Sequence, residues 1–387
     1  MQWDGRRLCI SAEPGTPVAL DLDGCYFSHC DADANGEACF TFAYSPSGHD
    51  RLGVRAREAR DGAPLGAQRT LHLGSPHSDV APLHATPLAP LREPEYLLGV
   101  DVDVSHIEVV IVIPVYNAAA AVERCLRSVL RYSRGRARLI VIDDASPDAD
   151  IAPLLARYRE LPGIELLTNA HNLGFTATAN RGIERAGRAD VVLLNADTEV
   201  GPNWLDGLRR AAWARQDIAT ATAVSDNAGA FSVPELEREN PVPDGWSFDQ
   251  AARALWQHAG HNYPELPTGN GFCLYIRRSV IDAIGLLDAK AFAQGYGEEN
   301  DFCQRACALG MRHVIAGNVL VHHERSLSFG HERRASLGRA GMQILRQRWP
   351  NYERDVGASL FSFARRVLDW RVRRLYAAAE ATNAAQP

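Results

Sequence analysis

The pattern of apolar and polar positions changes near residue 104. Before it, short apolar runs alternate with Gly, Pro, Asp and Ser, which is typical of β-strands joined by turns. The runs at Arg7–Ile10, Val18–Leu22 and Ala38–Tyr44 predict a small β-sandwich. Residues 81–104 are rich in proline, a composition typical of a linker. We therefore expect a domain boundary near residue 104.

From Ile107 onward, near-continuous Val, Ile and Leu runs alternate with stretches of helical periodicity. The predicted strands are Glu108–Ile113, Arg138–Ile142, Ile164–Leu167 and Asp190–Leu194. The predicted helices between them are Ala119–Tyr132, Ile151–Glu160 and Phe175–Ala186. Strands that are apolar on both faces and separated by helices predict an α/β fold, with a mostly parallel sheet and helices on both faces.

The chain of 387 residues exceeds the usual size of one hydrophobic core, so we expect several parts. The predicted parts are a β-rich accessory domain at 1–80, the linker at 81–104, an α/β domain at 105–335 and a C-terminal helical extension at 336–387.

Polar side chains follow the predicted strands. The first strand ends in Pro114-Val-Tyr-Asn117, the second in Asp143-Asp144-Ala-Ser146 and the fourth in Asn195-Ala-Asp197. Ligands of open α/β sheets bind outside the carboxyl ends of the strands, so these residues are candidates for a binding site. Asn117 and Ser146 have the alternative of capping the helices that follow them. Adjacent carboxylates such as Asp143 and Asp144 persist where a cation or hydrogen-bond donors compensate their repulsion.

A second polar cluster, Glu298-Glu299-Asn-Asp301, follows Gly295 and Gly297. The glycines predict a turn that leads into a helix carrying Cys303 and Cys307. Such carboxylates can act as a general base. Acidic residues also complement the dipole at the start of a helix, and this alternative stays open.

Several ordered blocks in the second part of the chain resemble the family 2 glycosyltransferases. They are PVYN at 114–117, DDAS at 143–146, NLGFTATANRG at 172–182, LLNADT at 193–198, TGNGFCLYIRR at 268–278, GYGEENDFCQRA at 295–306 and HERSLSFGHERR at 323–334. The resemblance implies the GT-A fold, a Rossmann-like sheet in one nucleotide-diphospho-sugar domain. It also implies transfer of a sugar from a nucleotide-diphosphate donor to an acceptor hydroxyl, with inversion of the anomeric centre. The product expected from it is a surface polysaccharide, an O-antigen or a similar glycan.

The same resemblance assigns roles to individual residues. Those expected on the donor side are Pro114, Tyr116, Asn117, Asp143, Asp144, Asn172, Gly174, Asn180 and Asn195. Those expected on the acceptor and sugar side are Gly269, Asn270 and Glu298. Glu299 matches the position of the catalytic base, with Asp301 as the second candidate.

The family's acidic metal motif keeps only its final carboxylate here, Asp197, and the partner ligand by similarity is His323. Mg²⁺ or Mn²⁺ suits such a site because it binds one or two carboxylates together with substrate phosphates and waters. His322 stands beside His323 on the same predicted strand. Since neighbouring strand residues point to opposite faces, at most one of the two histidines should reach the metal.

Composition narrows the partners. A net charge of −6 provides no basic field for nucleic acid. The first residues lack the apolar run of a signal peptide, which predicts a cytoplasmic protein. In that compartment the eight cysteines are expected to be thiols. They are better explained as small buried apolar side chains than as zinc ligands. Apolar and Arg side chains at 358–380 predict a basic amphipathic helix. This helix could lie on the cytoplasmic face of the inner membrane, where a lipid-linked acceptor would be reached, or dock on the catalytic domain.

Two rival functions were weighed. One is a non-catalytic sugar-nucleotide-binding or scaffold protein of the same fold, which the single remaining Asp of the metal motif leaves open. The other is a nucleotidyltransferase, which is disfavoured because no Gly-rich, basic triphosphate loop follows the first strand. The role of the β-rich domain stays open among carbohydrate binding, oligomerisation and a structural accessory.

Overall fold

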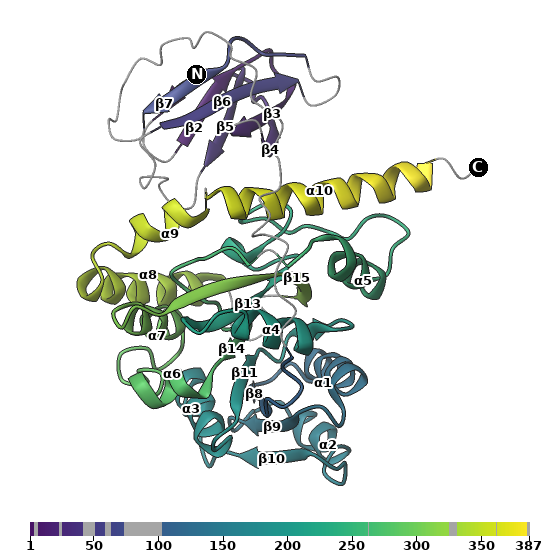
Figure 1. Ribbon diagram of the computed structural model, residues 1–387, viewed down its shortest axis with the longest axis vertical. Helices are drawn as coiled ribbons and strands as arrows, with labels where there is room; N and C mark the ends of the chain where they lie inside the picture. The colour runs from purple at the N-terminus through teal and green to yellow at the C-terminus, as the bar shows by residue number, and fades with distance from the viewer. Residues whose placement is uncertain are drawn as a thin grey trace. The chain divides into compact units, whose positions relative to one another are not determined.

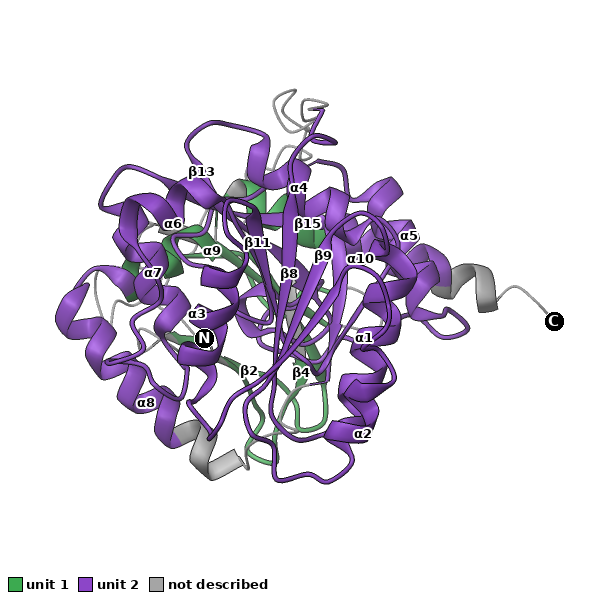
Figure 2. Ribbon diagram, turned by 90° about the horizontal axis from the view of Figure 1, so that it is seen from below, with its two compact units in different colours: residues 1–94, 353–370 green, residues 95–352, 371–387 purple. Residues whose placement is uncertain are grey.

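The fold is known from a computed structural model of the chain. It divides into two compact units, residues 1–94 with 353–370 and residues 95–352 with 371–387 (Figure 2). The residues that it describes are 1–3, 7–22, 25–41, 51–58, 63–72, 103–261, 263–324, 331–360 and 362–384. Most of the predicted proline-rich linker, and residues 42–44 of the third predicted strand, lie outside these ranges.

The first unit contains two antiparallel sheets, with strand orders β1-β2-β5 and β4-β3-β6-β7 (Figure 1). The strands are β1 (Gln2–Trp3), β2 (Arg7–Ser11), β3 (Pro17–Leu22), β4 (Cys25–Asp31), β5 (Glu37–Thr41), β6 (Arg51–Glu58) and β7 (Arg69–His72). Alternating side chains such as Leu8, Ile10 and Val18 are buried. The prediction of a β-rich part at the start of the chain is therefore confirmed.

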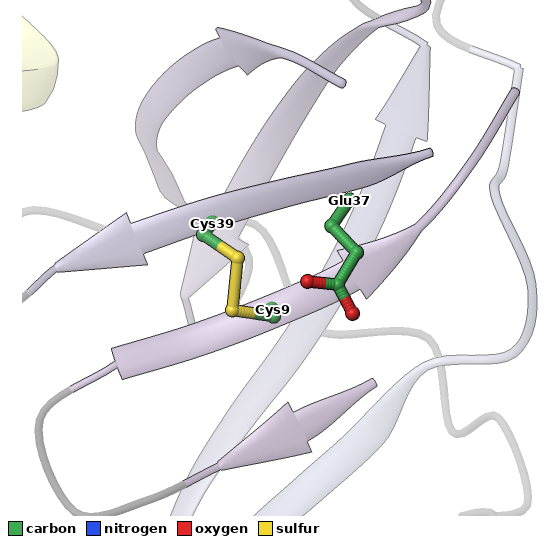
Figure 3. A group of neighbouring side chains, drawn as sticks. All are labelled: Cys9, Glu37 and Cys39. Carbon is green, nitrogen blue, oxygen red and sulfur yellow. A yellow bond between two sulfur atoms is a disulfide. The ribbon is translucent and has the colours of Figure 1, made fainter. Parts of the chain in front are cut away.

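A disulfide joins Cys9 of β2 to Cys39 of β5, which corrects the prediction that all eight cysteines are thiols (Figure 3). The two residues stand opposite each other in the antiparallel pairing of these strands. Glu37 lies beside them, but sulfurs that are joined to each other do not offer thiolates to a metal. Cys125, Cys273 and Cys303 are free and buried, as predicted for small apolar side chains.

The second unit is built on an eight-stranded mixed sheet with the order β10-β9-β8-β11-β14-β13-β15-β12 (Figure 1). Its strands are β8 (Val109–Val115), β9 (Arg138–Asp143), β10 (Ile164–Thr168), β11 (Asp190–Leu194), β12 (Thr198–Val200), β13 (Ile218–Ser225), β14 (Cys273–Ile276) and β15 (Arg312–His323). The four predicted strands, β8 to β11, are parallel to one another. β14 is antiparallel to both of its neighbours, and β12 is antiparallel to β15. The predicted mostly parallel sheet is thus confirmed in its first half.

Helices cover both faces of this sheet (Figure 2). They are α1 (Ala119–Ser133), α2 (Ile151–Ala156), α3 (Phe175–Arg185), α4 (Trp204–Trp213), α5 (Phe248–His258), α6 (Arg278–Ile284), α7 (Glu298–Cys307) and α8 (His331–Arg348), followed by α9 (Tyr352–Leu360) and α10 (Phe363–Ala384). On one face, alternate strand residues such as Val110 and Val112 pack against Ile183 of α3 and Phe302 of α7. The other set of alternate residues, such as Val109 and Ile111, is buried as well. Burial on both faces explains the unbroken apolar runs of these strands.

The predicted basic helix at 358–380 appears as parts of α9 and α10. Within the second unit, the ring of Tyr376 packs edge to face on Trp246, with their centroids 6.5 Å apart. Arg373 donates to the Pro234 carbonyl oxygen at 3.0 Å, and Arg371 donates to that of Ala259. These contacts match the docking alternative. In the part of the chain that the structure describes, every helix is too short or too polar to cross a bilayer.

Candidate active site

A cavity of about 650 Å³ lies at the carboxyl ends of β8, β9 and β11. Its wall includes most of the residues predicted for the site, and these are Pro114, Tyr116, Asn117, Asp144, Asn172, Gly174, Asn195, Asp197, Asn270, Glu298, Glu299 and His323. Four predicted residues do not line it, and these are Asp143, Asn180, Gly269 and Asp301. The structure therefore brings most of the predicted residues to one cavity and leaves four of them outside its wall.

The loops after β8 and β9 are tied to each other. The Asn117 N–H donates to Ser146 Oγ at 2.9 Å, and the Asp148 N–H donates to Asn117 Oδ1 at 3.1 Å. Neither Asn117 nor Ser146 caps its own following helix, so the capping alternative is wrong for both. Asn117 has a φ of 62° and Ala118 a φ of 60°. Left-handed backbone is costly for alanine, and such local strain persists where surrounding contacts fix it.

Hydrogen-bond donors compensate the adjacent carboxylates Asp143, which ends β9, and Asp144, which follows it. Asp144 Oδ1 accepts from Asn169 Nδ2 at 2.7 Å and from the Leu173 N–H at 2.8 Å. Its Oδ2 accepts from the Gly174 N–H at 2.9 Å. Asp143 Oδ1 accepts from the Ser146 N–H at 3.0 Å, inside its own loop. Asp144 thus holds the loop that presents Asn172 and Gly174 to the cavity.

His323 and Asp197 face each other across the end of β15. Nε2 of His323 lies 3.4 Å from Asp197 Oδ1. Nδ1 lies 3.2 Å from the Asn227 carbonyl oxygen, to which it can only donate, and the Phe272 ring stacks on the imidazole at 5.3 Å. In the neutral tautomer that makes this hydrogen bond, the proton is on Nδ1 and the lone pair of Nε2 points toward Asp197. A neutral imidazole and a carboxylate held in this way are a donor set for a divalent cation.

His322 points away from this pair, as the alternation of side chains along a strand predicts. Its Nδ1 lies 2.5 Å from Asp226 Oδ2, and this hydrogen bond raises the pKa of His322. The other oxygen of Asp226 accepts from the His323 N–H at 3.1 Å. Asp226 therefore fixes the end of β15 that carries both histidines. The rest of the predicted histidine block, residues 325–330, lies outside the described residues.

Glu298 and Glu299 open α7 and line the same cavity. Burial and the neighbouring carboxylate raise the pKa of Glu298 well above its usual range, while burial raises the pKa of Glu299. The two side chains share a hydrogen bond in which Glu298 is the proton holder. Glu299 Oε2 is buried and has no hydrogen-bond partner in the described structure. A carboxylate oxygen without a partner, on a residue that lines a cavity, is suited to accept a proton once it is ionised.

Asp301 does not reach the cavity, although the sequence made it the second candidate for the base. Its Oδ1 accepts from Arg348 Nη1 at 3.1 Å and from Trp349 Nε1 at 3.0 Å. Its Oδ2 accepts from Arg305 Nε at 3.0 Å. With only 1% of the residue exposed, the Asp301 carboxylate ties α7 to the end of α8.

Asn180 and Gly269 also have structural contacts. The amide of Asn180 donates to the Leu287 carbonyl oxygen at 2.8 Å and accepts from the Leu287 N–H at 3.0 Å. A Cβ at Gly269 would lie 2.6 Å from Leu274, so this glycine is required by packing. The arginine at position 277 stacks on Trp213 at 4.0 Å, which makes it a fold contact rather than a phosphate ligand.

Several residues that line the cavity were not predicted from the sequence. Phe272 and Tyr296 lie inside the blocks at 268–278 and 295–306, but nothing in the sequence indicated their role. Asp226 follows the buried strand β13 in the same way as Asp144 follows β9, and this pattern could have revealed it. Gly338 and Met342 line the cavity from α8, and no pattern in the sequence distinguishes them.

Parts of this chain are similar in sequence to known proteins. Residues 110–285 match the family description "Glycosyl transferase family 2". The chain is 28% identical over 191 residues to the low-salt glycan biosynthesis hexosyltransferase Agl10 of Haloferax volcanii, covering 45% of this chain and 55% of that protein. It is 31% identical over 126 residues to the succinoglycan biosynthesis protein ExoO of Rhizobium meliloti, covering 33% of this chain and 34% of that protein. The chain thus matches only part of the length of these relatives.

Among solved structures, the chain is similar to GalNAc-T7, which was crystallised with UDP, GalNAc and Mn²⁺. The TM-score is 0.50 at 16% sequence identity, and the match covers 64% of this chain and 49% of that chain. At this identity the similarity concerns the fold alone. Together with the mixed sheet and its helices, it confirms the predicted GT-A fold.

Proposed function

From the match of residues 110–285 to glycosyl transferase family 2, we propose that this chain is an inverting, metal-dependent enzyme of that family. It would move a hexosyl or deoxyhexosyl group from a nucleotide-diphosphate sugar to an acceptor hydroxyl. The observation that carries this proposal is the placement of two chemically different groups on one cavity. The Asp197–His323 pair lies on one wall, and the unpartnered oxygen of Glu299 lies on another.

Glu299 is the proposed base. Its Oε2 takes the proton of the acceptor hydroxyl while the acceptor oxygen forms a bond to the anomeric carbon of the donor. The bond from that carbon to the diphosphate oxygen breaks, and the nucleotide diphosphate leaves with the bonding electron pair. Because attack and departure occur on opposite faces of the carbon, the configuration inverts. The Glu298 proton, donated to Glu299, keeps the adjacent carboxylates from both being charged in a buried place.

The donor nucleotide is proposed to lie between the loops after β8 and β9. Tyr116 offers an aromatic surface, and Asn117 and Asn172 offer amides, all on the cavity wall. Asp144 acts indirectly, because its oxygens already hold the loop at 172–174. Asp143 is proposed in the same supporting role, since it binds within its own loop.

Asp197 and His323 would hold Mg²⁺ or Mn²⁺. The donor set fits, because the hydrogen bond from His323 Nδ1 to Asn227 leaves Nε2 as a ligand atom 3.4 Å from the Asp197 carboxylate. When bound, such an ion neutralises the charge that develops on the leaving diphosphate. Two protein ligands are enough for ions that complete their shell with phosphate and water.

The acceptor is proposed to be a glycan or a lipid-linked sugar in surface polysaccharide or O-antigen synthesis. The names of the relatives support this, since one concerns glycan and the other succinoglycan biosynthesis. A cytoplasmic location stays a prediction, and the Cys9–Cys39 disulfide argues against it because reducing compartments disfavour disulfides. Peripheral membrane contact through residues 358–380 also stays a prediction. Co-sedimentation with anionic vesicles, with and without residues 358–387, tests this membrane contact.

The deciding experiment starts with thermal stabilisation by a panel of UDP-, GDP- and dTDP-sugars in the presence of Mn²⁺. The donor found in this way is then used to measure hydrolysis and transfer by the wild type, Glu299→Gln and Asp197→Ala. We expect both variants to fold normally and to lose at least about 100-fold in rate. Glu184→Gln, on the exposed side of α3, is the matched control and should keep full activity. Wild-type rates in both site variants would remove this mechanism. Binding of the donor by a wild type that neither hydrolyses nor transfers it would favour the non-catalytic sugar-nucleotide-binding alternative.

A further inference from the structure

Helix α8 contains two glycines, Gly338 and Gly341, that lie three residues apart and hence on the same side of the helix. Glycine inside a helix costs about 0.5–1 kcal/mol relative to alanine, so each position calls for a physical reason.

Gly341 has a packing reason. A Cβ at this position would lie 1.8 Å from the Tyr296 carbonyl oxygen and 3.8 Å from the Gly297 nitrogen. The backbone of α8 therefore lies directly on the turn that precedes Glu298. The end of the same helix is fixed by hydrogen bonds from Arg348 and Trp349 to Asp301, and by the fully buried side chain of Leu345.

Gly338 has no such reason. A Cβ at this position would meet no atom of the described residues within 4 Å, and Gly338 lines the candidate active-site cavity together with Met342. Alanine at position 338 would stabilise the helix and would not clash with the described residues. A ligand that needs the space beside Gly338 explains why glycine is present.

The position of Gly338 and Met342 in the cavity indicates which ligand lies against them. α8 contacts residues 296 and 297, directly before Glu298 and Glu299, and lies on the side of the cavity that holds the proposed base. In an inverting transfer the base binds the acceptor hydroxyl, on the face of the anomeric carbon opposite the leaving diphosphate. Asn270 and Gln294 bring amides to the same cavity, and Met342 and Tyr296 bring apolar surface. A pyranose offers hydroxyls and an apolar C–H face to such a mixture.

We infer that Gly338 and Met342 form the wall against which the acceptor sugar lies, and that Gly338 sets the size of acceptor that can reach Glu299. This inference rests on the proposed function and deepens it, because it assigns acceptor selection to two residues of α8. A side chain at 338 would then exclude a sugar acceptor while leaving room for water and for the donor.

The test compares Gly338→Leu, Gly338→Ala and the control Ala340→Leu with the wild type. Ala340 is exposed on the same helix and does not line the cavity, so its variant carries a similar added side chain elsewhere. Three quantities are measured, namely the affinity for the nucleotide sugar by calorimetry, the hydrolysis of the donor in water, and the transfer to p-nitrophenyl hexosides. Thermal melting of each variant reports whether the helix has stayed folded.

We expect Gly338→Leu to reduce transfer by at least about 10-fold with an unchanged donor affinity and hydrolysis rate, and Gly338→Ala to have a smaller effect of the same kind. Ala340→Leu should behave as the wild type. Unchanged transfer in Gly338→Leu overturns the inference, and so does an equal loss of donor binding, which would place this wall on the donor side. If Gly338→Leu melts early, the alanine variant decides, because it favours the helix and still fills the wall. A wild type without any transfer or hydrolysis would instead contradict the proposed function itself.

Discussion

Nε2 of His323 lies 3.4 Å from Oδ1 of Asp197, while Nδ1 of the same imidazole lies 3.2 Å from the carbonyl oxygen of Asn227. In the tautomer with its proton on Nδ1, Nε2 and the carboxylate are two acceptors that face each other, an arrangement that a cation stabilises. The stack of Phe272 on the imidazole and the hydrogen bond from the His323 N–H to Asp226 keep the ring in this orientation. Contacts within the protein therefore hold the imidazole in place beside Asp197.

The first prediction concerns this metal. His323→Ala should weaken Mn²⁺ binding in the presence of the nucleotide diphosphate by about 10-fold or more, because one of two protein ligands is removed. Isothermal titration of Mn²⁺ into the nucleotide-bound protein measures the effect, and treatment with EDTA should abolish wild-type activity until Mn²⁺ is restored.

The matched control is His258→Ala, since His258 is exposed at the end of α5 and lies away from the cavity. This variant should bind Mn²⁺ as the wild type does. Full activity of the wild type in EDTA, or equal Mn²⁺ affinity in His323→Ala, would contradict the assignment.

The second prediction separates stability from chemistry at the start of α7. Asp301→Asn should lower the free energy of unfolding by about 2–3 kcal/mol, because the buried carboxylate accepts from Arg305, Arg348 and Trp349. Urea unfolding measures it. Asp282→Asn provides the control, because Asp282 is 61% exposed and pairs with Arg278 on the surface, a type of pair that contributes little. If Asp301→Asn were as stable as the wild type but inactive, Asp301 would take part in the reaction.

The contrast between Glu299 and Asp301 shows how far the sequence could lead. Both stand in one block of the chain, and the local pattern made both candidates for the base. The partners that distinguish them, Arg348 and Trp349, lie more than 40 residues away, at the end of α8. Asn180 is a similar case, since its amide is held by Leu287 at a separation of 107 residues. Contacts at such separations leave no periodic pattern to recognise.

The parallel strands were easier to predict. β8, β9 and β11 are buried on both faces, so their apolar runs are continuous, and their carboxyl ends meet at one edge because they are parallel. This geometry gathers Asn117, Asp144 and Asp197 without any knowledge of the loops between them. The disulfide could not be predicted from such a local pattern. It depends on the register of β2 and β5, which places Cys9 opposite Cys39.

The third prediction follows from the raised pKa of Glu298, which is buried beside Glu299. Because the folded protein binds this proton more tightly than the unfolded chain, the stability that the bound proton contributes is complete below the pKa of about 4.3 of a free glutamate. It is lost as the pH rises through the higher pKa of the folded state. The wild type should therefore lose stability with rising pH, by up to about 1.4 kcal/mol per pH unit within that window.

Glu298→Gln keeps a hydrogen-bond donor next to Glu299 but has no proton to lose, so its stability should depend less on pH over the same range. Urea unfolding of both proteins at a series of pH values from 5 upward checks this difference. Parallel curves for the two proteins would show that Glu298 does not hold a proton in the folded state.

The fourth prediction uses two glycines that both have a positive φ but have different surroundings. Gly174 has a φ of +85°, and a Cβ there would lie 2.2 Å from the Ala293 carbonyl oxygen. Gly187, at the end of the same segment, has a φ of +68° with nothing within 4 Å. Gly187→Ala should cost only the left-handed strain of about 1–2 kcal/mol. Gly174→Ala should cost about 1–3 kcal/mol more, because the backbone at 293 has to move.

Since the Gly174 N–H is held by Asp144 at the cavity wall, the same change should also weaken donor binding, whereas Gly187→Ala should leave donor affinity unchanged. Urea unfolding and calorimetry of the two variants with the nucleotide sugar measure both effects. Equal losses of stability in the two variants would mean that the loop at 172–174 does not pack against residue 293 in solution. A lower stability of Gly174→Ala with unchanged donor affinity would separate this loop from the donor site and leave the nucleotide to the loops after β8 and β9.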